Sequence, residues 1–129
     1  MQERVSNEIS EFWIENGILC AQFRDGALVD LDAAKDSVRI RDGLLNGRVM
    51  PILLDIRGLR ELTKGAREYL SSPECLKMTS AGVLLTNNSL FVRTLANIYF
   101  RLAQPNMPHR MFADREAALH WFEQHKRLN

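Results

Sequence analysis

The sequence lacks most features that mark secreted, membrane-bound or nucleic-acid-binding proteins. It has two cysteines, Cys20 and Cys75, which are far apart and show no metal-binding spacing. No apolar run approaches the roughly 18 residues of a membrane span, and the start, MQERVSNEIS, is too polar for a signal peptide. The net charge is +1, which gives no overall attraction to nucleic acid. We therefore expect a cytoplasmic protein with reduced thiols, no membrane span and no nucleic-acid partner.

Familiar catalytic and metal-binding motifs are also missing. The sequence has no P-loop of the form G-x-x-x-x-G-K-[ST], no G-x-S-x-G elbow and no H-E-x-x-H pair. His120 and His125 are five residues apart, whereas a helical metal pair needs a spacing of four. Asp55 is the one candidate general base, but an aspartate at a strand end more often binds loop amides. We expect no enzyme activity, no catalytic residue, no cofactor and no metal.

The order of apolar segments in the 129 residues predicts a single domain, 1–129, and its fold. Asn16-Gly17 between two apolar runs is typical of a hairpin turn. Capped helical segments then alternate with apolar strand segments, which favours parallel strands and right-handed crossovers. The predicted fold class is α/β, a mixed sheet with an N-terminal antiparallel hairpin followed by βαβ units. The predicted strands are 12–15, 18–23, 49–56, 81–86 and 109–113, the last at a sheet edge, with a short extended piece at 27–29. The predicted helices are 31–45, 63–70, 90–104 and 115–126, with a further turn at 74–78. The inner face of the last helix would hold Ala118, Trp121 and Phe122.

The stretch from Pro51 to Tyr69 organises the rest of the chain. The strand 49–56 is apolar at nearly every position, as in a central strand that is covered on both faces. Ligands and partners of open α/β sheets meet the carboxyl ends of such strands. The segment 55–67 is therefore the predicted binding edge, and its basic residues form either a docking point for an anionic group or a solvated loop. Its candidate residues are Asp55, Arg57, Gly58, Thr63 as a helix cap, Lys64 and Arg67.

A second group of candidates lies in the next strand–helix unit. Asn87 and Ser89 would flank the Thr63 loop if the two strands are neighbours, or they simply cap the helix 90–104. That helix is apolar over an arc of roughly 200°, about twice the arc needed to lie on a sheet. The surplus around Tyr99 and Phe100 either packs on a neighbouring helix, forms a dimer face or lines a pocket for an apolar ligand. A homodimer is expected, because the surplus apolar surface of this helix and the outer face of the hairpin would otherwise be exposed to solvent.

Two residues outside these groups carry expectations of their own. Arg41 falls between two apolar rows of the helix 31–45. Its stem would cover the core edge while its head reaches water, or its head would be a positioned cation for an anionic partner group. Cys75 follows a Ser-Ser-Pro-Glu loop, which favours an exposed thiol, whereas Cys20 alternates within a strand and is expected in the core.

With these units laid out, the chain resembles STAS domains, the fold of bacterial anti-sigma-factor antagonists. In that family a strand ends in an Asp, a short apolar loop follows, and an Asp-Ser-Ser-Gly-Leu type motif opens a helix. PILLD, IRGLREL and Thr63–Ala66 match these parts. From about Phe12 to Gln124 the chain is similar to uncharacterised bacterial STAS-like proteins. They share a Trp-x-Glu-x-Gly-Ile-Leu start, here Trp13–Leu19, and an Asp-Ile-Arg-Gly sequence, here Asp55–Gly58.

The resemblance implies a bacterial regulatory module that binds another protein through the edge 55–67. The antagonists are switched by phosphorylation of a serine just before the motif glycine, where this chain has Lys64, so Thr63 is the nearest hydroxyl. The alternative function is a carrier or sensor of a small apolar or amphipathic ligand. In that case Tyr99 and Phe100 would line the pocket, and a basic residue would hold an anionic head.

Overall fold

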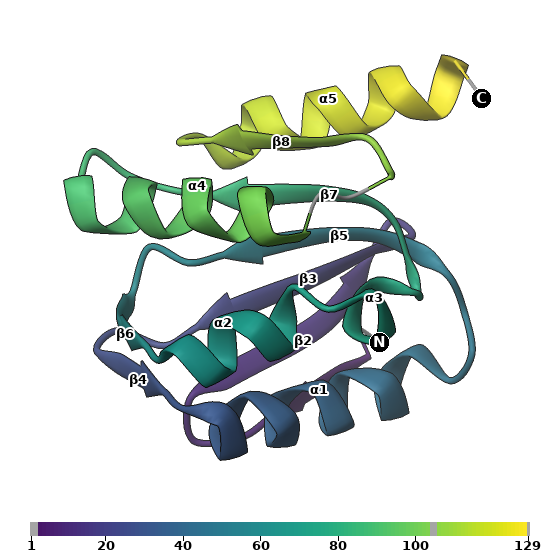
Figure 1. Cartoon of the computed structure of the whole chain (residues 1–129). Coiled ribbons are helices and arrows are strands. Elements are labelled where there is room, and N and C mark those ends of the chain that lie inside the picture. Colours follow the sequence, from purple (N-terminus) through teal and green to yellow (C-terminus); the bar gives the residue numbers. More distant parts are fainter. Residues whose placement is uncertain (1–2, 104–105, 129) are drawn as a thin grey trace.

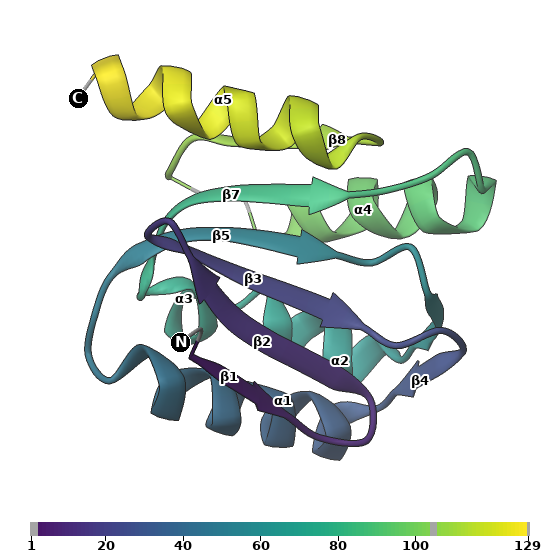
Figure 2. The same ribbon diagram turned by 180° about the vertical axis from the view of Figure 1, so that it is seen from behind.

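The computed structural model describes residues 3–103 and 106–128, and it contains a six-stranded sheet with helices on both faces (Figures 1 and 2). The strand order is β1-β2-β3-β5-β7-β8. The first three strands pair antiparallel, and the pairs from β3 to β8 are parallel, which confirms the predicted α/β class. The bounds are β1 (Arg4–Ser6), β2 (Ser10–Glu15), β3 (Ile18–Phe23), β5 (Met50–Asp55), β7 (Thr79–Leu85) and β8 (His109–Phe112).

The N-terminal hairpin forms where the sequence predicts it. Asn16 and Gly17 have φ angles of 52° and 77°, the conformation that a two-residue turn between β2 and β3 requires. Strand β1 was not predicted because its three residues, RVS, carry no extended apolar pattern. It pairs with β2 and forms one edge of the sheet, while β8 forms the other edge as predicted.

Helices α1 to α4 cover one face of the sheet, and α5 covers the other (Figures 1 and 2). Side chains of α1, α2 and α4 share a core with the first face, and α5 places Ala118, Trp121 and Phe122 against the second, as predicted. The predicted end of the third long helix, Gln104, lies outside the described residues. The bounds are α1 (Leu31–Leu45), α2 (Lys64–Leu70), α3 (Pro73–Leu76), α4 (Leu90–Ala103) and α5 (Arg115–Leu128).

A small parallel ribbon lies just beyond the carboxyl ends of β3 and β5 (Figure 1). It consists of β4 (Ala27–Val29) and β6 (Leu59–Leu62). The sequence predicts an extended piece at β4, but it predicts a loop at β6, because four residues with two charges give little strand signal. The Thr63 N–H donates to the Val29 carbonyl at 3.0 Å, so the ribbon also fixes where α2 begins.

Local sequence explains the helix boundaries. The Asp30 carboxylate accepts the Ala33 N–H at 2.8 Å and starts α1, which ends at Asn46 in the left-handed conformation. Ser72 caps α3 in the same way by accepting the Cys75 N–H at 3.2 Å. None of the helices in the described ranges is both long and apolar enough to cross a membrane.

Candidate functional site

The segments that follow the parallel strands gather at one edge of the molecule. Strands β5 and β7 are direct neighbours, with Asp55 opposite Leu85, so their following loops lie close together. The starts of α1, α2 and α4 lie at the same end of the sheet (Figure 1). We call this region the carboxyl edge and define it as residues 24–31, 55–67 and 86–91. It contains every predicted site residue except Tyr99 and Phe100.

Asp55 and Arg57 form a two-point ion pair at the start of the carboxyl edge. The Arg57 Nε and Nη2 donate to the two Asp55 carboxylate oxygens at 2.9 and 2.8 Å. The Arg57 backbone N–H also donates to Asp55 at 3.0 Å, so the prediction that this carboxylate binds a loop amide is confirmed. The hydrogen bond to Asp55 raises the pKa of Arg57. The Asp55 and Arg57 side chains therefore stabilise the turn that follows β5.

Gly58 is required by a close approach between two turns. A Cβ at this position would lie 2.8 Å from the Asp25 Oδ1 and 3.0 Å from both the Arg24 carbonyl oxygen and the Asp25 Cα. The same turns are joined by a hydrogen bond of 2.8 Å from the Gly26 N–H to the Gly58 carbonyl. The glycine of the Asp-Ile-Arg-Gly sequence thus lets the turn after β5 pack directly on the turn after β3.

Three candidates lie at or near the start of α2. Thr63 and Arg67 form hydrogen bonds within the fold, whereas Lys64 is a solvent-exposed cation. Thr63 caps the helix as predicted, because its hydroxyl accepts the Ala66 N–H at 3.2 Å. Arg67 donates from Nη1 to the Leu62 carbonyl at 2.9 Å. The Lys64 side chain is 81% exposed and lies 3.9 Å from a Glu68 oxygen, so its charge faces solvent.

Asn87 and Ser89 act as caps at the start of α4. The Asn87 side-chain oxygen accepts the Ser89 N–H at 2.9 Å, and the Ser89 hydroxyl accepts the Val92 N–H at 3.4 Å. This confirms the interpretation that they cap the helix. Because β5 and β7 are neighbours, the loops that follow these two strands both lie at the carboxyl edge (Figure 1).

The carboxyl edge also exposes large apolar side chains that the sequence pattern does not predict. Leu90 is 81% exposed, Leu28 is 57% exposed and Phe91 is 46% exposed. Leu28 stands between the buried Ala27 and Val29 on β4, so strand alternation was the one available signal for its exposure. Leu90 and Phe91 open α4, where the helical pattern alone does not show how far the sheet extends beneath the first turn.

Tyr99 and Phe100 lie in the second half of α4, away from the carboxyl edge. The Tyr99 hydroxyl donates to the Leu70 carbonyl at 3.2 Å, and burial raises the pKa of the Tyr99 phenol. The Phe100 ring centroid lies 4.7 Å from that of His109. Both residues therefore pack on neighbouring elements, which accounts for part of the surplus apolar arc.

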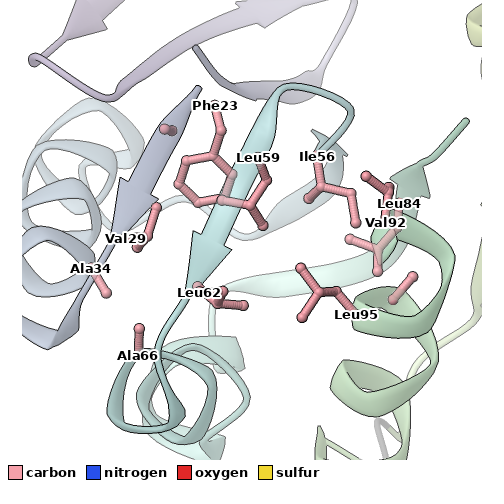
Figure 3. Packing of buried hydrophobic residues seen from close by; sticks show 12 residues of the cluster. Phe23, Val29, Ala34, Ile56, Leu59, Leu62, Ala66, Leu84, Val92 and Leu95 are labelled. Carbon is pink, nitrogen blue, oxygen red and sulfur yellow. The ribbon is translucent and has the colours of Figure 1, made fainter. Parts of the chain in front are cut away.

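The same two residues line a partly open cavity of about 90 Å³. The cavity lies between the sheet and the helices α1 to α4. Leu62 and Leu95, which point toward each other in Figure 3, both belong to its lining. Its lining is almost entirely apolar. Lining side chains come from every layer, among them Val38, Ile52, Leu54, Leu59, Leu62, Leu70, Leu95, Tyr99 and Phe100.

Arg41 and Cys75 occupy one end of this cavity, and both differ from prediction. Arg41 is 7% exposed, so the expectation that its head reaches water is wrong. Its Nη2 donates to the Cys75 carbonyl at 2.9 Å and to an Asp42 carboxylate oxygen at 3.0 Å. Cys75 is 4% exposed because the short helix α3 turns it inward over Arg41, so its predicted exposure is also wrong. Burial raises the pKa of the Cys75 thiol.

The histidines and acidic residues do not assemble into a metal centre. In the part of the chain that the structure describes, no group of three or more His, Cys, Asp or Glu side chains could hold a metal ion. His125 is half-buried, and its ring Nδ1 lies 3.3 Å from the Trp121 carbonyl oxygen. Cys20 is buried in the core beneath α5, as predicted.

The sheet order, the antiparallel hairpin and the parallel crossover units define a SpoIIAA-like α/β domain. The chain matches a crystal structure of an uncharacterised DUF3478-family protein with a SpoIIAA-like fold from Shewanella loihica PV-4, at a TM-score of 0.59. The match covers 94% of this chain and 91% of that chain, with 14% sequence identity. At this identity the likeness shows the fold alone, and it confirms the fold that the STAS resemblance implies.

The chain belongs to the family described as a domain of unknown function, DUF7793, whose model matches residues 12–126. No curated protein matches the chain.

Proposed function

We propose that this domain is a non-enzymatic regulatory module that binds another protein through the carboxyl edge. The observation that carries the proposal is the exposure of three large apolar side chains, Leu28, Leu90 and Phe91, at the edge where the fold also collects its loops. Apolar side chains that face solvent at the centre of a patch are typical of protein-binding surfaces.

Charge at the same edge would orient the partner. Lys64 and Arg60 are exposed cations on α2 and β6, within the carboxyl edge. Arg57 and Arg67 contribute less, because each is already bound to a carboxylate or carbonyl of its own chain. The partner surface is therefore expected to be apolar with an acidic rim. Thr63 is occupied as a helix cap, so the proposal needs no phosphorylation switch.

Charge reversal at the exposed positions tests this proposal. A variant with Arg60→Glu and Lys64→Glu should lose at least tenfold in affinity for a captured partner, while its thermal unfolding stays within a few degrees of wild type. Arg101→Glu, an exposed cation at the opposite end of α4, is the matched control. If the edge variant and the control retain the same partners with the same affinity, the carboxyl edge is not the binding surface.

The cavity beside Tyr99 and Phe100 supports a second candidate function, that of a carrier or sensor of a small apolar or amphipathic ligand. Native mass spectrometry of freshly purified protein tests it. A mass increment that is lost on denaturation would support a bound ligand, and the same spectrum would show whether the chain forms the proposed homodimer. A bare-chain mass would favour the protein-binding module.

A further inference from the structure

The cavity contains one cation within an otherwise apolar lining. Among the described residues that line it, Arg41 alone carries a charge. A guanidinium that is 7% exposed is costly to bury unless its donors are paired. The hydrogen bonds of Arg41 therefore show whether any of its donors remains available for a ligand.

The donors of Arg41 are unequally satisfied. Nε and Nη2 donate to Asp42 Oδ1 at 3.1 and 3.0 Å, and Nη2 also donates to the Cys75 carbonyl at 2.9 Å. Nη1 donates to the Cys75 sulfur at 3.5 Å. A thiol is a weak acceptor, whereas a carboxylate oxygen is a strong one for a guanidinium. Because a guanidinium has five donors in a planar fork, it can hold Asp42 on one edge and a second carboxylate at Nη1.

The volume limits the size of the apolar part of such a ligand. A cavity of 90 Å³ is about six-tenths of the roughly 150 Å³ of an engineered apolar cavity that takes up benzene. An apolar space of this kind stays dry and accepts small apolar groups. It has room for a tail of about three to five carbon atoms, and it is too small for a long acyl chain.

We propose that the cavity binds a short-chain aliphatic carboxylic acid of about four to six carbons, with the carboxylate on Arg41 Nη1 and the tail among Leu70, Leu95 and Tyr99. This inference rests on the second proposed function, a ligand carrier or sensor, and names its ligand class. Arg41 thereby takes the role of the basic residue that holds an anionic head.

Isothermal titration of the full chain with pentanoate and with 1-pentanol at pH 7 tests the proposal. The two probes share a tail, and only pentanoate carries a charge. We expect pentanoate to bind about tenfold or more tightly than 1-pentanol. Arg41→Met should reduce pentanoate binding to the level of 1-pentanol. Arg39→Met, an exposed arginine on the same helix, should leave both unchanged. Leu70→Phe, which fills the cavity, should weaken both probes.

The outcomes distinguish the role of Arg41 from the existence of a ligand site in the cavity. Equal affinities for pentanoate and 1-pentanol would overturn the role of Arg41 but would leave a ligand-binding cavity. Failure of both probes to bind would overturn the cavity as a ligand site. If Arg41→Met does not fold, the Arg41 Nε–H resonance in wild-type protein decides the question. It should shift on addition of pentanoate but not of 1-pentanol, and an unshifted resonance would overturn the proposal.

Discussion

Replacing Gly58 by alanine is expected to destabilise the protein, although the same replacement often stabilises a chain. Alanine restricts the unfolded state and gains about 0.4–1 kcal/mol where it fits. At Gly58 the new Cβ would meet the Arg24 carbonyl oxygen and the Asp25 Cα, both at 3.0 Å, and both belong to the backbone. Backbone atoms cannot swing away as a side chain can, so the turns after β3 and β5 must separate.

The two effects oppose each other, and their magnitudes decide the sign. Overpacking of this kind costs about 1–3 kcal/mol. After the gain from the unfolded state is subtracted, a net loss of between about 0 and 2.6 kcal/mol remains, and the mid-range values give about 1.3 kcal/mol. In a domain of this size each kcal/mol lowers Tm by about 3–5 °C, so the mid-range loss corresponds to a fall of about 4–7 °C. The hydrogen bond from the Gly26 N–H to the Gly58 carbonyl lies in the same contact and would lengthen.

Gly43 provides the matched control, because it is a glycine within α1 whose added Cβ would meet nothing within 4 Å. Gly43→Ala should stabilise the protein by about 0.5–1 kcal/mol. Urea unfolding of wild type and both variants, followed by circular dichroism with unchanged m-values, measures the difference. If Gly58→Ala is as stable as wild type, the close approach of the two turns does not constrain this position, and the reasoning fails.

Two further predictions follow from the ion pair at the carboxyl edge and from the buried thiols. Asp55→Asn should cost about 1–2 kcal/mol in urea unfolding, because Arg57 loses its charged acceptor, whereas Glu68→Gln on the exposed pair should change stability by less than about 0.5 kcal/mol. Burial raises the pKa values of Cys20 and Cys75, so the folded chain holds these protons more tightly than the unfolded chain. The urea midpoint should therefore fall as the pH rises above about 8.5, and Cys75→Ala should reduce that fall; a midpoint independent of pH between 7.5 and 9.5 would contradict this.

Much of the fold was readable from local sequence. Asn16-Gly17 selects its hairpin turn through two positive φ angles, and Asp30 and Thr63 start helices through caps that need only neighbouring residues. The elements that were missed, β1 and β6, have three and four residues. Strands of this length depend on pairing with a distant segment, so their own residues carry little periodic signal.

The site was less readable, because the function of each side chain depends on its contacts across the fold. The sequence places Arg57 and Lys64 in one basic cluster. The structure separates them, since Arg57 is bound at two points to Asp55 while the Lys64 side chain faces solvent. The expected exposure of Arg41 and Cys75 failed for the same reason, because no local pattern shows that α3 folds over α1.

Some cations at the carboxyl edge are bound within the fold and others are exposed, and mutations of the two kinds must be interpreted differently. Reversing the charge of Arg57 would leave Asp55, which is 9% exposed, beside a second carboxylate. Lost partner binding in that variant would then report an altered turn and not a lost contact. Reversal at Lys64 removes a charge whose ion-pair partner, Glu68, is itself exposed, so a loss of binding there is attributable to the surface. Evidence for a partner at this edge therefore has to come from the exposed cations and from Leu28, Leu90 and Phe91, whose side chains the fold itself leaves uncovered.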